Sequence, residues 1–120
     1  MKDKTALLAA FYILFFVVLT LYAGEDVSIF KQIDRGEKSF YMELLIKNPT
    51  KQKLETEIQS LVRKYKGQRS LQIDIFDDLE ALQRRGDDKY PTRLIYKYWL
   101  VSITDKEIHR FYIKERPDIK

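Results

Sequence analysis

The sequence predicts an α+β fold in which an N-terminal transmembrane helix precedes a two-layer sandwich. Three observations support this prediction. Residues 6–23 form an uninterrupted uncharged run, residues 50–66 carry one amphipathic helical stripe, and the segments on both sides of that helix have the composition of strands. The expected element order is β-β-α-β-(α)-β-β, which gives a mixed sheet of about 4–5 strands with the main helix on one face.

The composition excludes several classes of protein and of site. Of the 120 residues, 45% are hydrophobic and 33% are charged, which is typical of globular domains and not of disordered or collagen-like chains. Lys and Arg number 22 against 18 Asp and Glu, so the net charge is +4. Because the chain has no Cys and 1 His, it lacks the residues for disulfides, for thiolate metal sites and for most zinc sites or His-based triads. We therefore expect no bound metal and no cofactor.

The run of residues 6–23 is long enough to cross a membrane. As a helix it would measure about 27 Å, close to the thickness of the hydrocarbon core of a bilayer. A cleaved signal peptide is the competing interpretation, because a short basic segment precedes the apolar run. Signal processing requires small residues one and three positions before the cut, yet Leu21 stands at the third position for cleavage after Ala23. The sequence favours an uncleaved anchor, with secretion after cleavage near Ala23 as the alternative.

Charges on the two sides of this run predict its orientation. Lys2 and Lys4 precede it, whereas Glu25 and Asp26 follow it. By the positive-inside rule the N-terminus lies in the cytoplasm and the remainder of a single-pass membrane protein lies outside it. The expected organisation is an anchor or signal peptide at residues 1–24, an extracytoplasmic α+β domain at 25–116 and a tail at 117–120.

A hairpin is predicted at the start of the exported part. Residues 27–33 and 39–47 are rich in β-branched, apolar and aromatic side chains, and a turn-forming segment with Gly36 separates them. Asn48, Pro49 and Thr50 then provide a helix start, with either Asn48 or Thr50 as the cap. The following helix ends at Gly67. Its apolar stripe consists of Leu54, Ile58, Leu61, Val62 and Tyr65.

The second half of the chain continues the sheet. Residues 70–76 alternate between apolar and polar, and Asp77 or Asp78 is suited to cap a short helix through residues 79–83. After a polar loop at 84–91, residues 94–103 and 108–113 are predicted to be the two strands of a terminal hairpin. The helix between two strands favours a right-handed parallel crossover, and the last hairpin extends the sheet in antiparallel fashion.

This order of features resembles small exported bacterial α+β domains of unassigned function. The resemblance extends over about residues 39–113 and rests on the strand, the Asn48-Pro49-Thr50 helix start, the alternating strand, the polar loop and the hairpin that bears Trp99. It implies an exported two-layer domain and brings no active site with it.

Acidic residues and one histidine are the candidates for catalysis. Asp74, Asp77, Asp78 and Glu80 lie at the end of a predicted strand, where carboxylates often bind Mg²⁺, although Asp77 and Asp78 also suit a helix N-terminus. His109 has an unperturbed pKa near neutrality, but no nucleophile is evident beside it. A small metal-assisted or acid/base hydrolase using Asp74, Asp77 and His109 is the alternative hypothesis, and no catalytic residue is assigned.

An aromatic and basic surface is the candidate for binding. Tyrosines and the single tryptophan interleave with Arg and Lys in the C-terminal third of the chain. The leading hypothesis is a membrane-anchored, non-enzymatic module that contacts a protein or a component of the cell envelope, without nucleic acid and in an oligomeric state that stays open. The residues predicted to bind are Trp99, Tyr96, Tyr98, Arg110 and Tyr112.

Overall fold

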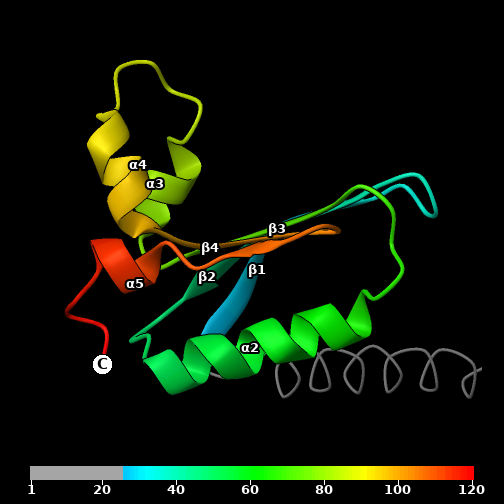
Figure 1. Cartoon of the computed structure of the whole chain (residues 1–120). Coiled ribbons are helices and arrows are strands. Elements are labelled where there is room, and N and C mark those ends of the chain that lie inside the picture. Colours follow the sequence, from blue (N-terminus) through cyan, green and yellow to red (C-terminus); the bar gives the residue numbers. More distant parts are fainter. Residues whose placement is uncertain (1–25) are drawn as a thin grey trace, which may run out of the picture.

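The computed structural model describes residues 26–120 as a mixed five-stranded sheet with the longest helix along one face (Figure 1). The strands follow one another in the sheet in the order in which they occur in the chain. The elements are β1 (Val27–Asp34), β2 (Phe40–Ile46), α2 (Lys51–Lys64), β3 (Leu71–Phe76), α3 (Leu79–Gln83), α4 (Thr92–Tyr98), β4 (Trp99–Thr104), β5 (Ile108–His109) and α5 (Tyr112–Glu115).

The pairing of the strands confirms the predicted mixed sheet. β1 and β2 form an antiparallel hairpin, and β2 pairs with β3 in parallel after the crossover through α2. β3 and β4 are antiparallel, as are β4 and β5. The parallel pair requires a long connection, and α2 provides it while covering the sheet.

The main core lies between α2 and the sheet. Thr50 caps the helix, since its Oγ1 accepts a hydrogen bond of 3.1 Å from the backbone N–H of Lys53. Asn48, the other predicted cap, instead has φ of 49° in the turn before the helix, a conformation that Asn tolerates. Leu54 and Ile58 are fully buried at 0% exposure, as the helical stripe predicts.

A second, smaller core lies on the opposite face of the sheet, at one end of it. Figure 1 shows α3 and α4 standing above that end, while α2 runs below. Phe76 projects from β3 into this cluster. The remainder of this face carries no helix, and we call it the open face. The buried side chains of the second core are Phe76, Ala81, Leu82, Tyr90 and Ile95.

The predicted strand at residues 94–103 was wrong in its first half. Residues 92–98 form α4, and only from Trp99 does the chain continue as β4. In this segment Leu94, Ile95 and Tyr98 recur at helical spacing and pack on the second core, whereas Tyr96 is exposed. The aromatic and β-branched composition suggested a strand, but packing against α3 selects the helix.

The predicted strand at residues 108–113 also ends early. β5 contains only Ile108 and His109, and the chain then turns into α5. Tyr112 is thereby buried in the main core, where its hydroxyl reaches Glu55 of α2. The expected loose tail at residues 117–120 is packed as well, because Ile119 is 4% exposed within the main core.

The predicted membrane segment at residues 1–24 lies outside the described residues. Between residues 26 and 120, the structure contains no helix with both the length and the apolar character needed to cross a membrane.

Replacement of Ile58 by Asp tests the packing of α2. The change buries an unpaired carboxylate, so we expect a loss of about 3 kcal/mol or more in the free energy of unfolding. The matched control is Gln59→Asp, one position along the helix on its exposed face, which should cost under about 0.5 kcal/mol. Urea unfolding of the full chain in mild detergent, followed by the fluorescence of Trp99, measures both. Equal losses would contradict the assignment of the buried face.

Candidate binding face of the sheet

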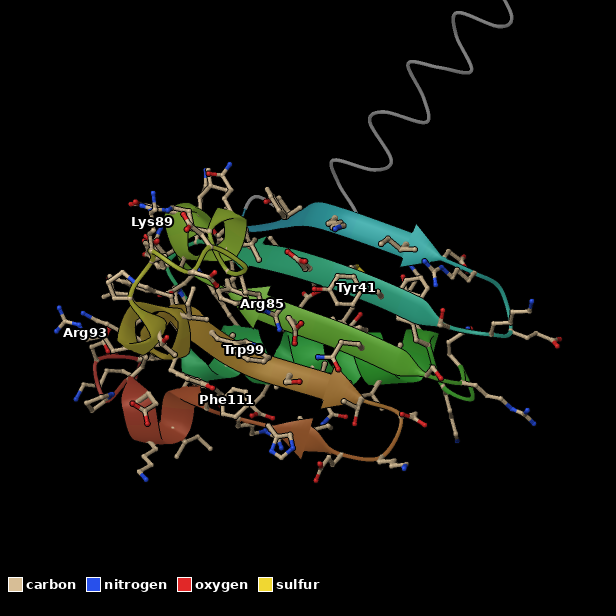
Figure 2. All side chains as sticks on the ribbon, turned by 90° about the horizontal axis from the view of Figure 1, so that it is seen from above. Tyr41, Arg85, Lys89, Arg93, Trp99 and Phe111 are labelled. Carbon is tan, nitrogen blue, oxygen red and sulfur yellow. The ribbon has the colours of Figure 1, made fainter. Side chains whose placement is uncertain are left out.

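A row of polar side chains crosses the middle of the open face. Glu43 on β2 stands opposite Asp74 on β3, and Asp74 stands opposite Ser102 on β4. Tyr41 and Gln72 form the neighbouring pair on the same face. Figure 2 views this face directly, with Tyr41 at its centre and the α3–α4 end to one side. Alternation along the strands places the polar residues here and their apolar neighbours in the main core.

Asp74 is completely buried although no helix covers it. Its exposed fraction is 0% because surrounding side chains close over it. Oδ1 accepts hydrogen bonds from Gln72 Nε2 at 2.7 Å and from Trp99 Nε1 at 3.1 Å. Oδ2 accepts one from Arg85 Nη1 at 2.7 Å. A buried carboxylate requires this kind of full compensation, so the site around Asp74 is held in one arrangement.

Arg85 reaches over the open face from the loop that follows α3. Besides Asp74, its Nη1 donates to the hydroxyl of Tyr41 at 3.2 Å. The guanidinium lies 4.2 Å from the centre of the Trp99 ring, within the range of a cation–π contact. Within residues 26–120, the Nε and Nη2 donors of Arg85 have no hydrogen-bond partner. Part of a fixed guanidinium fork therefore stays available for an acceptor.

Tyr41 and Glu43 complete the polar row. The Tyr41 hydroxyl donates to Glu43 Oε1 at 2.5 Å. Burial, together with this hydrogen bond, raises the pKa of Tyr41 well above its usual value, so the phenol keeps its proton and remains a donor. Ser102 Oγ accepts from Gln72 Nε2 at 3.1 Å. No buried side-chain nitrogen or oxygen among residues 26–120 lacks a partner, which is typical of a rigid network.

Aromatic rings extend the site beyond the polar row. Trp99 lies 5.9 Å from Phe76 and 5.3 Å from Phe111, measured between ring centres. Tyr96, which is 52% exposed, lies 6.3 Å from Trp99 with an angle of 17° between the two rings. Trp99 thus joins the second core to the solvent-facing part of the sheet.

A solvent-open hollow of about 420 Å³ lies beside Trp99. Arg85, Trp99, Tyr96 and Thr92 are among the residues that line it. Lys89 and Arg93 are exposed at the same end of the domain (Figure 2). The hollow therefore combines a fixed guanidinium with aromatic rings, at an end of the domain that also carries exposed cations.

The structure separates the five residues predicted to bind. Trp99 and Tyr96 line the hollow together. Tyr98 packs on the second core, with the Arg116 guanidinium 5.6 Å from its ring centre. Arg110 and Tyr112 lie elsewhere, because both bind Glu55 of α2. Arg110 donates from Nε at 2.6 Å and from Nη2 at 3.0 Å, and the Tyr112 hydroxyl donates at 2.9 Å.

The three residues of the hydrolase hypothesis lie in different contacts. Asp74 is enclosed by Arg85, whereas Asp77 Oδ2 is 2.8 Å from Arg116 Nη1. Burial raises the pKa of Asp77 and outweighs the opposing effect of Arg116. His109 Nε2 lies 2.8 Å from Glu107 Oε1, on the far side of β4 from Asp74.

The remaining acidic residues of the predicted cluster have structural contacts. Asp78 caps α3 through a hydrogen bond of 3.0 Å from the backbone N–H of Ala81. Glu80 pairs with Arg84 at 3.3 Å. Within residues 26–120, no group of three or more His, Cys, Asp or Glu side chains is arranged to hold a metal ion.

Glu43 and Arg85 are parts of the site that were not predicted from the sequence. A signal for Glu43 exists, because a charged residue in the middle of the apolar segment FYMELLI is unusual for a strand with a buried face. Asp74 has the same place in LQIDIF, and the two are register partners. Arg85 offers no such signal, since its partner Asp74 is determined by the path of the loop.

Comparison with known proteins yields no relative, since no family model, no curated protein and no solved structure matches the chain.

Replacement of Arg85 by Gln tests the network around Asp74. Without the guanidinium the Asp74 carboxylate is buried and has no cation, so we expect a loss of roughly 3 kcal/mol in the free energy of unfolding. Arg84→Gln removes the same charge one position earlier, where the arginine pairs with Glu80 and Asp87 at the surface, and should have a much smaller effect. The difference between the two urea midpoints is the measurement, and the absence of any difference would show that Asp74 does not depend on Arg85.

The pH dependence of stability tests the contact of Glu55 with Arg110 and Tyr112. The hydrogen bonds from Arg110, with that from Tyr112, hold the pKa of Glu55 below its usual value. A lowered folded-state pKa stabilises the fold above the unfolded pKa of about 4.3, and this stabilisation is lost as the pH falls through the folded pKa. In Glu55→Gln, urea midpoints should therefore decline less between about pH 5 and about pH 3 than in the wild type. Glu115→Gln, an exposed change on α5, should retain the wild-type slope.

Proposed function

We propose that this chain is a membrane-tethered, extracytoplasmic binding module that contacts a protein or a component of the cell envelope through the open face of its sheet. The observation that carries the proposal is the hollow beside Trp99, where the open face meets α4 and where a fixed guanidinium and two aromatic rings reach solvent. Rigid aromatic and arginine side chains of this kind are common anchors of binding surfaces.

Contact is favoured over catalysis by the hydrogen bonds of the ionisable groups. Asp74 is occupied by Arg85, Trp99 and Gln72, so its carboxylate has no free lone pair directed to solvent. Asp77 pairs with Arg116, and His109 contacts Glu107. A general acid or base must reach the reacting atom within about 3 Å, and this arrangement offers no common point for the three groups.

The membrane tether rests on the uncharged run of residues 6–23 and on its distance from β1. β1 starts at Val27, so only residues 24–26 separate the run from the first strand. An extended chain of that length spans about 10 Å, which would keep the domain beside the bilayer. A domain held beside the bilayer is close to membrane proteins and envelope components, which are therefore the expected partners.

Photo-crosslinking tests the proposed binding face. A benzophenone amino acid at Tyr96 should form specific adducts in the native membrane, since this side chain is exposed beside the hollow. The same group at Arg63, an exposed position on α2 at the opposite face of the sheet, is the control and should give few adducts. Equal adduct patterns from the two positions would contradict the open face as the binding surface.

Cysteine labelling in the same cells tests the location. Because the chain has no Cys, single cysteines at Thr5 and Ser60 report each side of the membrane without background. A membrane-impermeant maleimide should label Ser60→Cys in intact cells, and Thr5→Cys only after lysis. Labelling of Ser60→Cys only after lysis would place the domain in the cytoplasm and overturn the proposal.

A further inference from the structure

The hollow beside Trp99 contains the features that bind a charged sugar. Arg85, Trp99 and Tyr96 line it, and Thr92 and two aspartates complete much of its wall. The guanidinium, the aromatic rings and the carboxylates differ in the ligand groups with which they can interact. The combination of these groups therefore restricts the chemical class of the ligand more than the surface charge alone does.

Arg85 provides a preorganised site for an anion. Its Nη1 is fixed on Asp74 at 2.7 Å and on Tyr41 at 3.2 Å, and the guanidinium lies 4.2 Å from the centre of the Trp99 ring. Its Nε and Nη2 have no partner within residues 26–120. A carboxylate is an acceptor that matches the planar donor fork, and little conformational entropy is lost because the side chain is already ordered.

Tyr96 and Trp99 provide apolar ring faces next to this anion site. Their centres are 6.3 Å apart, and their planes differ by 17°, so the two rings present similarly oriented surfaces. The electron-rich face of an aromatic ring attracts the weakly positive C–H groups on the flat side of a sugar ring. Tyr96 is 52% exposed, which leaves it accessible to a ligand.

Charges around the hollow favour a sugar polymer over a nucleic acid. Lys89 and Arg93 are exposed cations without an ion-pair partner in the described part of the chain. Asp87 and Asp88 line the same hollow. Asp87 pairs with Arg84 at 3.1 Å, whereas a carboxylate such as that of Asp88 can accept hydrogen bonds from sugar hydroxyls, which the phosphodiesters of a nucleic-acid backbone do not donate.

We propose that this hollow binds an acidic polysaccharide, with a sugar ring stacked on the exposed ring of Tyr96 beside Trp99 and its carboxylate on Arg85. The inference rests on the proposed function, because it names the chemistry of the envelope component that the open face contacts. Lys89 and Arg93 interact with the carboxylates of neighbouring sugar units.

Binding of defined polymers to the full chain in detergent tests the inference. The probe is oligogalacturonate, which has a carboxylate on each ring. Dextran oligomers supply rings without charge, poly-L-glutamate supplies charge without rings, and oligo(dT) represents nucleic acid. Fluorescence of Trp99, the single tryptophan, reports binding at the hollow itself. We expect a saturable change with oligogalacturonate that weakens as the salt concentration rises, and none with the other three polymers at the same concentrations.

Variants locate the binding site. Lys89→Glu combined with Arg93→Glu should weaken oligogalacturonate binding about tenfold or more, whereas Lys51→Glu combined with Lys66→Glu, the same charge change on exposed positions at the α2 side, should not. Tyr96→Ala removes the exposed ring and should weaken binding to a similar degree. Arg85→Lys retains a cation beside Asp74 but removes the fork, so it should weaken binding while the domain stays folded.

Several outcomes would overturn the inference. Equal binding of poly-L-glutamate would indicate charge attraction without recognition of rings, and tighter binding of oligo(dT) would indicate a nucleic-acid ligand. If no polymer binds while crosslinking from Tyr96 persists, the sugar inference fails and the binding module stands. If neither binding nor crosslinking occurs, both proposals fail.

Discussion

The ion pair between Arg85 and Asp74 is the interaction on which the open face depends. Asp74 is 0% exposed on a central strand, and removal of a carboxylate from water is costly unless a cation and hydrogen bonds replace the solvent. Arg85 supplies the cation from a surface loop. If this loop moved away from the sheet, the Asp74 carboxylate would lose its cation while it is still buried. The same guanidinium lies against Trp99, which couples the position of the loop to that of the aromatic rings. The need of the buried Asp74 carboxylate for a cation thereby fixes the positions of Arg85 and Trp99, two of the residues that line the hollow.

The two faces of β3 have opposite physical roles. Ile73 and Ile75 point into the main core between the sheet and α2, where burial of apolar surface holds the helix against the sheet. Asp74, between them in sequence, belongs to the polar network of the other face, and Phe76 anchors the second core. Successive side chains of a strand alternate between its two faces. The six residues of β3 therefore contribute both to the main core and to the hydrogen-bonded network of the open face. The aromatic rings and the guanidinium are therefore positioned before any ligand arrives.

Local patterns predicted the strands and the main helix, whereas long-range packing decided the parts that were wrong. The helix from Lys51 to Lys64 has a clear stripe and a Thr50 cap, both readable within a few residues. Residues 94–98 satisfy helix and strand patterns equally, and only the contact with α3 selects the helix. Trp99 and Tyr96 were predicted for the site by composition, but Arg85 was not, because its partner Asp74 lies 11 positions away on another element. Arg110 and Tyr112, also predicted to bind, lie apart from Trp99 for the same reason, since the turn after His109 carries them toward Glu55 on α2.

The shallow form of the hollow agrees with a module that works while tethered. One guanidinium and the aromatic rings beside it would contact only a small part of the proposed ligand, and a site of that size is expected to have a modest affinity for a single sugar unit. In the proposed function a polymer repeats the unit and membrane anchors confine many copies of the domain to one surface, so a bound polymer would meet the next hollow at a high effective concentration. Each contact can then form and break rapidly while the polymer remains attached. Such binding requires that each hollow be ordered before the ligand binds, because the conformational entropy lost on ordering would otherwise be paid at every contact along the polymer. The ion pair of Arg85 with the buried Asp74 supplies that order.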